Sequence, residues 1–438
     1  MKSSRFTSLV AFVLAALVFP LQILAIAGLW LYEQARVHGA PFAPLALGVN
    51  SYTNLIADAY QAMDVVSREL VGFIPAVQRN SSAERCALNA NAVRSGVVPI
   101  NSAAGDVTPA MSIPAAAYQT IGNKSLQITK ARYAPFSWTG EDQVALNSGA
   151  GYLTIKQDQI AQAMRALVNE AELDLATAAT VGASRAYGTA GTTPFATTLA
   201  ATAQIRKILS DNGAPVESGD LHLVMDTAAG ANVRTLTQLT KVNEAADASL
   251  LRQGVLLNIH GFNLRESAQV LTPTAGTMAS ATSTSAAFTV GQTAIPLATA
   301  GTGVVAAGDI ITFANDTNQY VVSAVSFAGA NPASGDTITL AAPGLRKAQG
   351  IATRAITVIA AAARNVGFTR NAIQFATRLP ALPAEGDLAT MREIITDDRS
   401  GLSFELAAYP GYRMTTYHLL IAWGQLVVKP EHVATLLG

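Results

Sequence analysis

The sequence contains a single cysteine among its 438 residues, Cys86. One cysteine excludes an intrachain disulfide and a metal site built from several cysteine ligands. A secreted domain held together by disulfide bonds is therefore disfavoured. Within the segment ERCALNANAV, a buried or half-buried apolar role for Cys86 is favoured over a reactive thiol, because free cysteines are commonly buried.

Charged and aromatic side chains are also scarce. Only 13% of the residues are charged and 6% are aromatic, whereas 50% are hydrophobic and the formal net charge is zero. An ordinary soluble domain has about 25% charged residues. The chain therefore has no long-range field that would attract nucleic acid, a membrane or an acidic substrate. Proteins with little surface charge tend to associate, which suits a subunit that packs against copies of itself.

No motif for catalysis, cofactor binding or metal binding is present. The five histidines show no paired metal-ligand spacing, and there is no G-x-S-x-G segment. They are His38, His222, His260, His418 and His432. The glycine-rich stretch 301–308 lacks the dinucleotide spacing, and IGNKS around Lys124 lacks the first glycine of a P-loop. We therefore expect no catalytic, cofactor-binding or metal-binding residues, no cofactor and no enzymatic activity.

Asp397 and Asp398 are the one carboxylate pair that resembles an acid/base site. Adjacent residues point apart on a strand, and the sequence DDRSG is ordinary turn composition. A structural role in a turn is therefore the favoured interpretation.

Residues 8–32 form an uncharged apolar run of 25 residues. The run is longer than the apolar core of a signal peptide, about 7–15 residues, although Ala25–Ala27 resembles a cleavage site. Its length fits a transmembrane helix of about 20 residues, but Pro20 and Gln22 lie near its middle. A third interpretation is that residues 1–50 are upstream sequence that the mature protein lacks, and this is the one we favour.

Four helical segments follow from apolar spacing. Residues 53–73 have the three/four spacing of an amphipathic helix, which Pro75 ends. Residues 152–181 form the strongest pattern, with Gly182 as its C-cap, and about 28 residues at 1.5 Å each span roughly 40 Å. A helix over 196–211 stops at Asn212-Gly213, and the strand 221–225 precedes a helix capped by Asp226.

The remaining segments predict extended structure. Frequent proline and glycine between 97 and 149 indicate an extended hairpin or long loop. After a Ser/Thr/Ala/Gly-rich linker, six short apolar runs within about 75 residues are typical of a small β-barrel or sandwich inserted between helical and mixed sequence. They lie at 287–290, 293–298, 309–314, 319–327, 336–342 and 355–360. A hairpin turning at Pro410-Gly411, a central strand over 418–428 and a C-terminal turn complete the chain.

The order of these parts resembles that of a tailed-bacteriophage major capsid protein. More narrowly, the chain from Ser51 to Gly438 resembles the coat protein of short-tailed phages whose shell subunit carries an inserted β domain. The resemblance lies in the segments VVSRELVGFIPAV, NKSLQITKARYAPFSW, LNSGAGYLTIKQDQIAQAMRALVNEAELDLA, GDIITFANDTNQYVV and ITDDRSGLSFELAAYPGYR. The apolar run at the N-terminus has no counterpart in that family.

The resemblance implies an α+β fold of the tailed-phage major capsid type, with an N-terminal arm, an extended hairpin loop, a long spine helix, peripheral and axial domains, and an all-β inserted domain. The implied ranges are 1–50 for the apolar extension and linker, 51–99 for the arm, 100–150 for the hairpin loop, 151–191 for the spine helix and peripheral domain, 192–270 for the first part of the core, 271–364 for the inserted domain and 365–438 for the second part of the core.

The resemblance further implies a non-enzymatic subunit that assembles into an icosahedral shell around a double-stranded DNA genome. Its partners would be copies of itself in pentamers and hexamers, a scaffolding protein during assembly, a portal protein, and packaged DNA without sequence-specific binding. It would be located in the virion after assembly in the cytoplasm of a bacterial host. The alternative is a membrane-anchored or secreted β-rich surface protein that uses residues 8–32 as anchor or signal.

Overall fold

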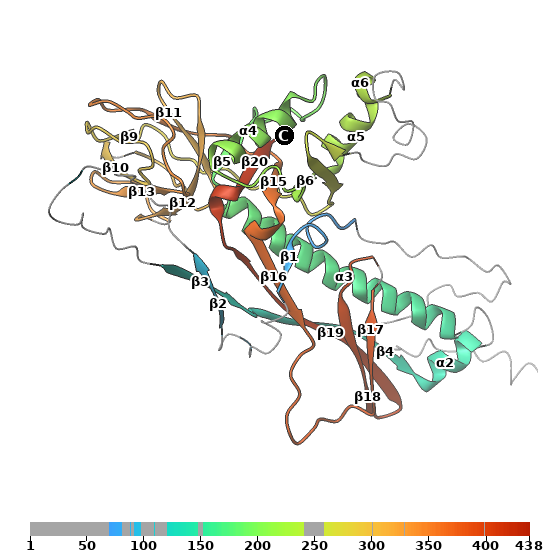
Figure 1. Cartoon of the computed structure of the whole chain (residues 1–438). Coiled ribbons are helices and arrows are strands. Elements are labelled where there is room, and N and C mark those ends of the chain that lie inside the picture. The colour runs from blue at the N-terminus through green and yellow to red at the C-terminus, as the bar shows by residue number, and fades with distance from the viewer. Residues whose placement is uncertain are drawn as a thin grey trace, which may run out of the picture. The chain divides into compact units, whose positions relative to one another are not determined.

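The computed structural model describes residues 70–80, 88, 92–97, 109, 121–147, 152–240, 258–299, 301–327, 329–397 and 399–438 (Figure 1). The chain divides into two units, 1–58 and 59–438, and all described residues belong to the second. The apolar run, Cys86, Asp398 and most of the arm helix expected at 53–73 lie outside the described residues.

One end of a twelve-stranded sheet, together with three helices, forms the first core. Its strands are β5 (Arg185–Tyr187), β6 (Leu221–Met225), β7 (Asn258–Ile259), β8 (Phe262–Glu266), β15 (Arg364–Thr369) and β20 (Val433–Leu437). Its helices are α4 (Ala200–Asp211), α5 (Thr227–Thr235) and α6 (Thr237–Thr240). The strands run in the order β7-β8-β6-β15-β20-β5, and the β6–β8 and β20–β5 pairs are parallel.

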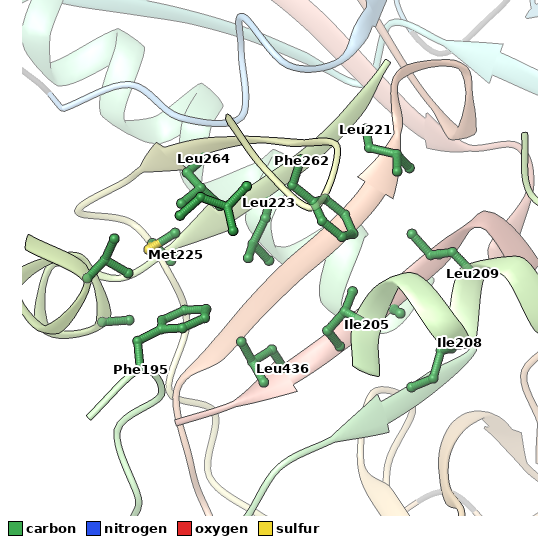
Figure 2. Close-up of a cluster of buried hydrophobic side chains, with 14 of the residues drawn as sticks. Phe195, Ile205, Ile208, Leu209, Leu221, Leu223, Met225, Phe262, Leu264 and Leu436 are labelled. Atoms are coloured by element: carbon green, nitrogen blue, oxygen red, sulfur yellow. The ribbon is translucent and has the colours of Figure 1, made fainter. Parts of the chain in front are cut away.

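The apolar side of α4 packs on this sheet. Ile205, Ile208 and Leu209 point from the helix toward strand residues such as Leu436 (Figure 2). A Cβ on Gly367 of β15 would lie 2.6 Å from Ile205 Cγ2, so the close approach of helix and strand requires glycine there. The helix ends before Gly213, whose φ is +78°, as the sequence predicts.

The expected cap of α5 is also confirmed. Asp226 follows β6 directly, and its Oδ1 accepts a hydrogen bond of 3.0 Å from the backbone N–H of Ala229. This bond satisfies one of the backbone donors left free at a helix N-terminus.

A β-rich segment continues the same sheet. Its strands are β9 (Thr282–Ser283), β10 (Ala294–Thr299), β11 (Ile310–Phe313), β12 (Gln319–Val325), β13 (Thr337–Leu340) and β14 (Ile356–Val358). They enclose an apolar cluster of their own. The prediction of a strand at 287–290 is wrong, because Phe288 makes only an isolated bridge with Gln349. β12 pairs antiparallel with β5, so the backbone of this segment is hydrogen-bonded to the first core.

A second sheet has six strands, and the long helix α3 (Tyr152–Val181) lies beside it (Figure 1). Its strands are β1 (Gln78–Arg79), β4 (Lys130–Thr139), β16 (Ile373–Arg378), β17 (Met391–Thr396), β18 (Ser403–Gly411) and β19 (Met414–Val427). β19 is central, as predicted, with β4 along one edge and β18 followed by β16 along the other. The thirty-residue α3 confirms the helix predicted over 152–181.

Gly182 follows α3 for a different reason from the one expected. Its φ is not in the left-handed region, but a Cβ there would lie 2.7 Å from Val427 Cγ2 and 2.9 Å from the carbonyl oxygen of Ala178. The glycine is therefore required by the close approach of β19 to the end of α3.

The segment before α3 and the turn between β18 and β19 differ from the sequence predictions. β2 (Ala92–Val97) and β3 (Gly122–Gln127) pair as a two-stranded hairpin, whereas β4 pairs with β19 at ten positions and is followed by α2 (Gly140–Asn147). Trp138 is the only buried residue of β4, and the strand is held mainly by its ten-position pairing with β19. The β18–β19 turn lies at Tyr412–Arg413 rather than at Pro410-Gly411.

The prediction of a C-terminal turn is also wrong. Residues 433–437 form β20, which is fully buried between β15 and β5. Its five apolar or small residues satisfy the pattern of a strand covered on both faces.

Candidate functional site

The four described histidines form no shared cluster, and His38 lies outside the described residues. The ring nitrogen Nδ1 of His260 lies 2.6 Å from the hydroxyl of Thr202, and His418 stacks on Tyr133 with ring centroids 4.8 Å apart. His432 lies in a short 3₁₀ turn, and burial lowers its pKa. Each of these histidines therefore has a local packing environment of its own.

His222 is buried in β6 against the ring of Phe368. Burial, together with the nearby positive charges of Arg265 and Arg370, lowers its pKa to about 4, while the charge of Asp220 opposes the shift. The imidazole is therefore neutral at physiological pH and acts as a packed ring.

Asp397 has the turn role that its sequence indicated. Its Oδ2 accepts hydrogen bonds from the backbone N–H of Ser400 (3.0 Å) and from the Ser400 hydroxyl (2.7 Å). Its own N–H donates to the carbonyl of Leu402 at 2.9 Å, which closes the β17–β18 turn. The carboxylate is thus occupied by the turn.

Within the described ranges, no group of three or more His, Cys, Asp or Glu side chains is arranged to hold a metal ion. In the same part of the chain, no helix combines the length and the apolar character needed to cross a membrane.

A buried carboxylate fixes the described segment 70–80 to α3. Glu172, 1% exposed, accepts backbone hydrogen bonds from Gly72 (2.6 Å), Phe73 (2.6 Å) and Ile74 (3.0 Å). Burial raises the pKa of the Glu172 carboxyl, and the three N–H donors oppose that shift. Because the donors lie about 100 positions earlier in the sequence, this contact holds two distant parts of the chain together.

A second set of polar contacts holds α3 against the six-stranded sheet. Asp174 Oδ1 accepts 2.7 Å from Lys130 Nζ, and Asp174 Oδ2 accepts 2.8 Å from the indole N–H of the buried Trp423. Glu170, one turn earlier, pairs with Arg132 at 2.9 Å. Both carboxylates project from one side of the helix toward β4 and β19.

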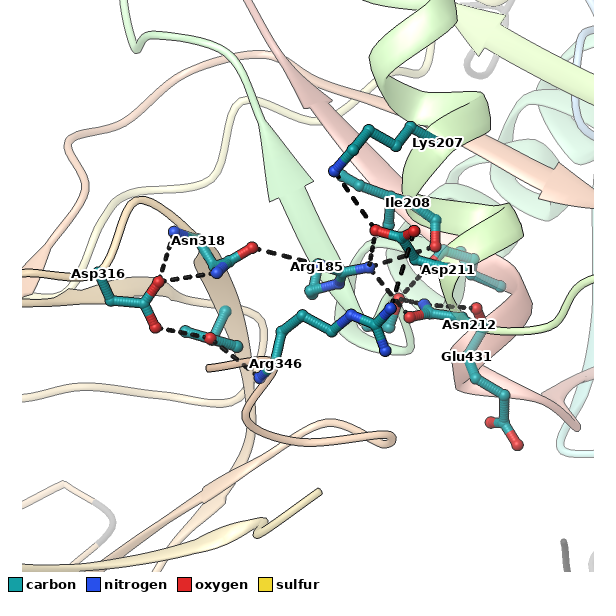
Figure 3. Close-up of polar contacts among 12 residues, drawn as sticks. Arg185, Lys207, Ile208, Asp211, Asn212, Asp316, Asn318, Arg346 and Glu431 are labelled. Carbon is teal, nitrogen blue, oxygen red and sulfur yellow. Dashed lines mark hydrogen bonds and ion pairs between the residues drawn. The ribbon is translucent and has the colours of Figure 1, made fainter. Parts of the chain in front are cut away.

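A third polar cluster lies where β5 meets the β-rich segment (Figure 3). The Arg185 side chain, 3% exposed, donates to the Ile208 carbonyl (3.3 Å), to Asn212 Oδ1 (3.1 Å) and to Asn318 Oδ1 (3.3 Å). Burial lowers the pKa of its guanidinium, whereas Asp211, 3.7 Å away, raises it. One arginine therefore links α4 to the loop before β12.

The far end of the six-stranded sheet combines an unpaired strand edge with exposed apolar side chains. β17 is the last strand, its residues are mostly exposed, and no other described strand pairs with its outer edge. Large apolar side chains are exposed on and around it: Leu382 (52%), Leu388 (86%), Ile394 (64%) and Tyr412 (92%). A surface of this kind is typical of a protein–protein contact. We call β17 with its flanking loop 379–390 the open sheet end.

Sequence reasoning missed most of these features. In the helix predicted over 152–181, the sequence places Glu172 and Asp174 on the polar faces, and Arg185 belongs to no motif. Nothing in the local sequence distinguishes a carboxylate that will be buried by a segment 100 positions away from one that stays in water.

No known protein family matches the chain, and no curated protein is similar to it in sequence. Several solved structures are similar in fold. A structure of Mycobacterium phage Che8 has 15% identity over 88% of this chain and 98% of that chain, with a TM-score of 0.49. The capsid of the cyanophage P-SCSP1u has 13% identity, 91% and 99% coverage, and a TM-score of 0.46.

The capsid of a native GTA particle has 10% identity over 90% of this chain and 98% of that chain, with a TM-score of 0.46. The latter two structures are of capsids.

Proposed function

We propose that the chain is a major capsid protein of a tailed bacteriophage, a non-enzymatic subunit that assembles with copies of itself into an icosahedral shell around double-stranded DNA. In this proposal the protein resides in the virion after assembly in the host cytoplasm. Its other partners are a scaffolding protein, a portal protein and the packaged DNA, which it contacts without reading sequence.

The open sheet end is the observation that supports this proposal most directly. It presents exposed apolar side chains beside an edge strand with no described partner. A single copy cannot cover this surface, whereas neighbouring copies in a shell can. The neutral net charge removes the long-range repulsion that would keep copies apart.

The parts of the chain receive roles within the proposal. The thirty-residue α3 is the spine of the peripheral domain, and the β2–β3 hairpin belongs to the loop that reaches a neighbouring copy. The β-rich segment, with its own apolar cluster, is the inserted domain, which stabilises the subunit and its contacts between capsomers. The dense polar contacts at Glu172, Asp174 and Arg185 support a subunit whose parts keep fixed positions.

The test is negative-stain electron microscopy of a chain that begins near Asn50, with and without a scaffolding protein. The expected result is closed shells or large regular assemblies. Monodisperse monomers under both conditions would refute the proposal.

The N-terminal run needs a separate experiment, since residues 8–32 lie outside the described residues. We propose that residues 1–50 are missing from native particles. Mass spectrometry of purified shells would show this by the absence of peptides from Leu9–Leu31. Recovery of the protein in membrane fractions with that segment intact would instead favour the anchored surface protein.

A further inference from the structure

We propose that β17 pairs antiparallel with β17 of a second copy, about a two-fold axis that passes beside Ile394. The inference deepens the proposed function, because it rests on copies of the chain meeting one another and names one contact by which they do so. It follows from the direction of the backbone groups, the register and the charges of the strand.

The direction of the backbone groups follows from the β17–β18 turn. The N–H of Asp397 donates to the carbonyl of Leu402, and this pair continues the register in which Thr396 faces Ser403. Alternate residues of an antiparallel strand point their N–H and C=O to the same neighbour. Residues 391, 393, 395 and 397 therefore form backbone hydrogen bonds with β18. The backbone N–H and C=O groups of Arg392, Ile394 and Thr396 point to the open edge.

A two-fold axis between two antiparallel copies of one strand passes beside a residue that faces itself, either an outward-directed residue in a hydrogen-bonded pair or an inward-directed residue in a non-hydrogen-bonded pair. With Glu393 on the axis, two carboxylates would face each other, and with Ile395 on the axis only Ile394 and Thr396 would pair, which gives about four hydrogen bonds. With Ile394 on the axis, Ile394 faces Ile394, and Arg392 faces Thr396 on each side of it. Each facing pair exchanges two hydrogen bonds, about six in all. With Arg392 on the axis, two arginines would face each other, which is unfavourable. With Thr396 on the axis, the pairing would run into the turn after residue 396.

Side chains at this register are compatible with close contact. Ile394 is 64% exposed, so pairing two copies would bury an apolar side chain from each. Arg392 is held within its own chain by Glu405 and Asp387, so it adds no unpaired charge to the contact. Glu393 would face Ile395 of the second copy, so no like charges oppose each other. The strand is therefore complementary to itself at one register.

Because β17 is complementary to itself at this register, we assign a second copy of the chain as the partner of its open edge. An unrelated peptide added to the edge would make the same backbone bonds, but it would have no reason to fix Ile394 at the centre. Cysteine crosslinking distinguishes self-pairing from the binding of an unrelated peptide, because only self-pairing places the same residue of two identical chains face to face.

The experiment uses the full chain with Cys86 replaced by serine, carrying either Ile394→Cys or Glu393→Cys. In the proposed pair the two Ile394 Cα atoms are about 5.5 Å apart, within the range of a disulfide. The two Glu393 Cα atoms are offset by two residues along the strands and are about 8 Å apart, beyond that range. We expect oxidation to give at least about tenfold more covalent dimer with Ile394→Cys than with Glu393→Cys.

A proline variant provides the complementary test. Because the N–H of residue 394 points to the open edge, Ile394→Pro removes no bond to β18 and should fold normally. Ile395→Pro removes a bond to β18 and serves as the comparison for damage to the strand. We expect Ile394→Pro to keep the circular-dichroism spectrum of the natural chain and to lose the contact, seen as a lower sedimentation coefficient at equal concentration.

Equal crosslinking of the two cysteine variants, or unchanged self-association of Ile394→Pro, would overturn the inference. Electron microscopy of the same samples keeps it distinct from the proposed function. Shells without preferential Ile394 crosslinking would leave the capsid role intact and remove this contact. Preferential crosslinking in samples that contain dimers only would support the contact and count against the capsid role.

Discussion

Replacing Glu172 should release the segment around Phe73 from α3. Its carboxylate oxygens accept three backbone N–H groups, all buried. Glu172→Ala leaves all three without an acceptor, at about 1–3 kcal/mol each, which is a large share of a domain stability of about 5–15 kcal/mol. Glu172→Gln keeps one acceptor oxygen and turns the amide N–H₂ toward another donor, so its cost should be about 2 kcal/mol.

The measurement is amide hydrogen exchange at Gly72, Phe73 and Ile74, together with urea unfolding. We expect faster exchange at these amides in both variants, most strongly in Glu172→Ala. Glu170→Gln is the matched control on the same helix, because its carboxylate is partly exposed and its ion pair should contribute no more than about 1 kcal/mol. Unchanged exchange at all three amides in Glu172→Ala would refute the reasoning.

The raised pKa of Glu172 predicts how the free energy of unfolding changes with pH. Burial raises the pKa of Glu172 in the folded chain, so the folded state binds this proton more tightly than the unfolded state. The stability that this linkage contributes is fully present below the unfolded pKa and is lost as pH rises through the folded pKa. Glu172→Gln does not titrate, so its unfolding free energy should lack this decline. A parallel pH profile for the two proteins would contradict the assigned cause.

Three further substitutions test other contacts. The guanidinium of Arg364 is 1% exposed and has no hydrogen-bond acceptor among the described residues, and the charge of Asp309 only partly offsets the effect of burial on its pKa, so Arg364→Met should raise the melting temperature in calorimetry, by a stabilisation of about 1–3 kcal/mol. Gly367→Ala places a Cβ 2.6 Å from Ile205 and should lower the unfolding free energy in urea by about 1–3 kcal/mol. Arg185→Lys cannot span the Ile208, Asn212 and Asn318 acceptors together and should speed proteolysis of the β-rich segment; unchanged cleavage would argue against the joint.

Local patterns predicted the elements whose signals lie within one segment. The spacing over 152–181, the stop at Asn212-Gly213 and the cap at Asp226 each depend on residues a few positions apart, and each is found in the structure. Five of the six short strands of the β-rich segment are present for the same reason, since alternation within four to seven residues is enough to indicate them.

The predictions that proved wrong concern elements whose partners lie far away in the sequence. β4 was assigned to a hairpin because its neighbours are rich in proline and glycine, but its ten-position register with β19 depends on residues almost 300 positions later. Residues 433–437 form a strand where the sequence predicts a C-terminal turn, because so short a strand is recognised only through its partners, β15 and β5. Glu172 belongs to the same class, because burial by a distant segment leaves no local pattern.

These contacts explain a structural consequence of the small number of charged residues. In the described part of the chain, several charged groups lie where segments meet, and Glu172, Asp174 and Arg185 each contact residues that are far away in the sequence. Charges placed there are not available to cover the surface. The open sheet end therefore keeps its apolar side chains exposed, and in water such a surface favours contact with another copy over solution as a single chain. The composition that disfavours an electrostatically steered binding protein is thus the same composition that favours a subunit completed by its neighbours.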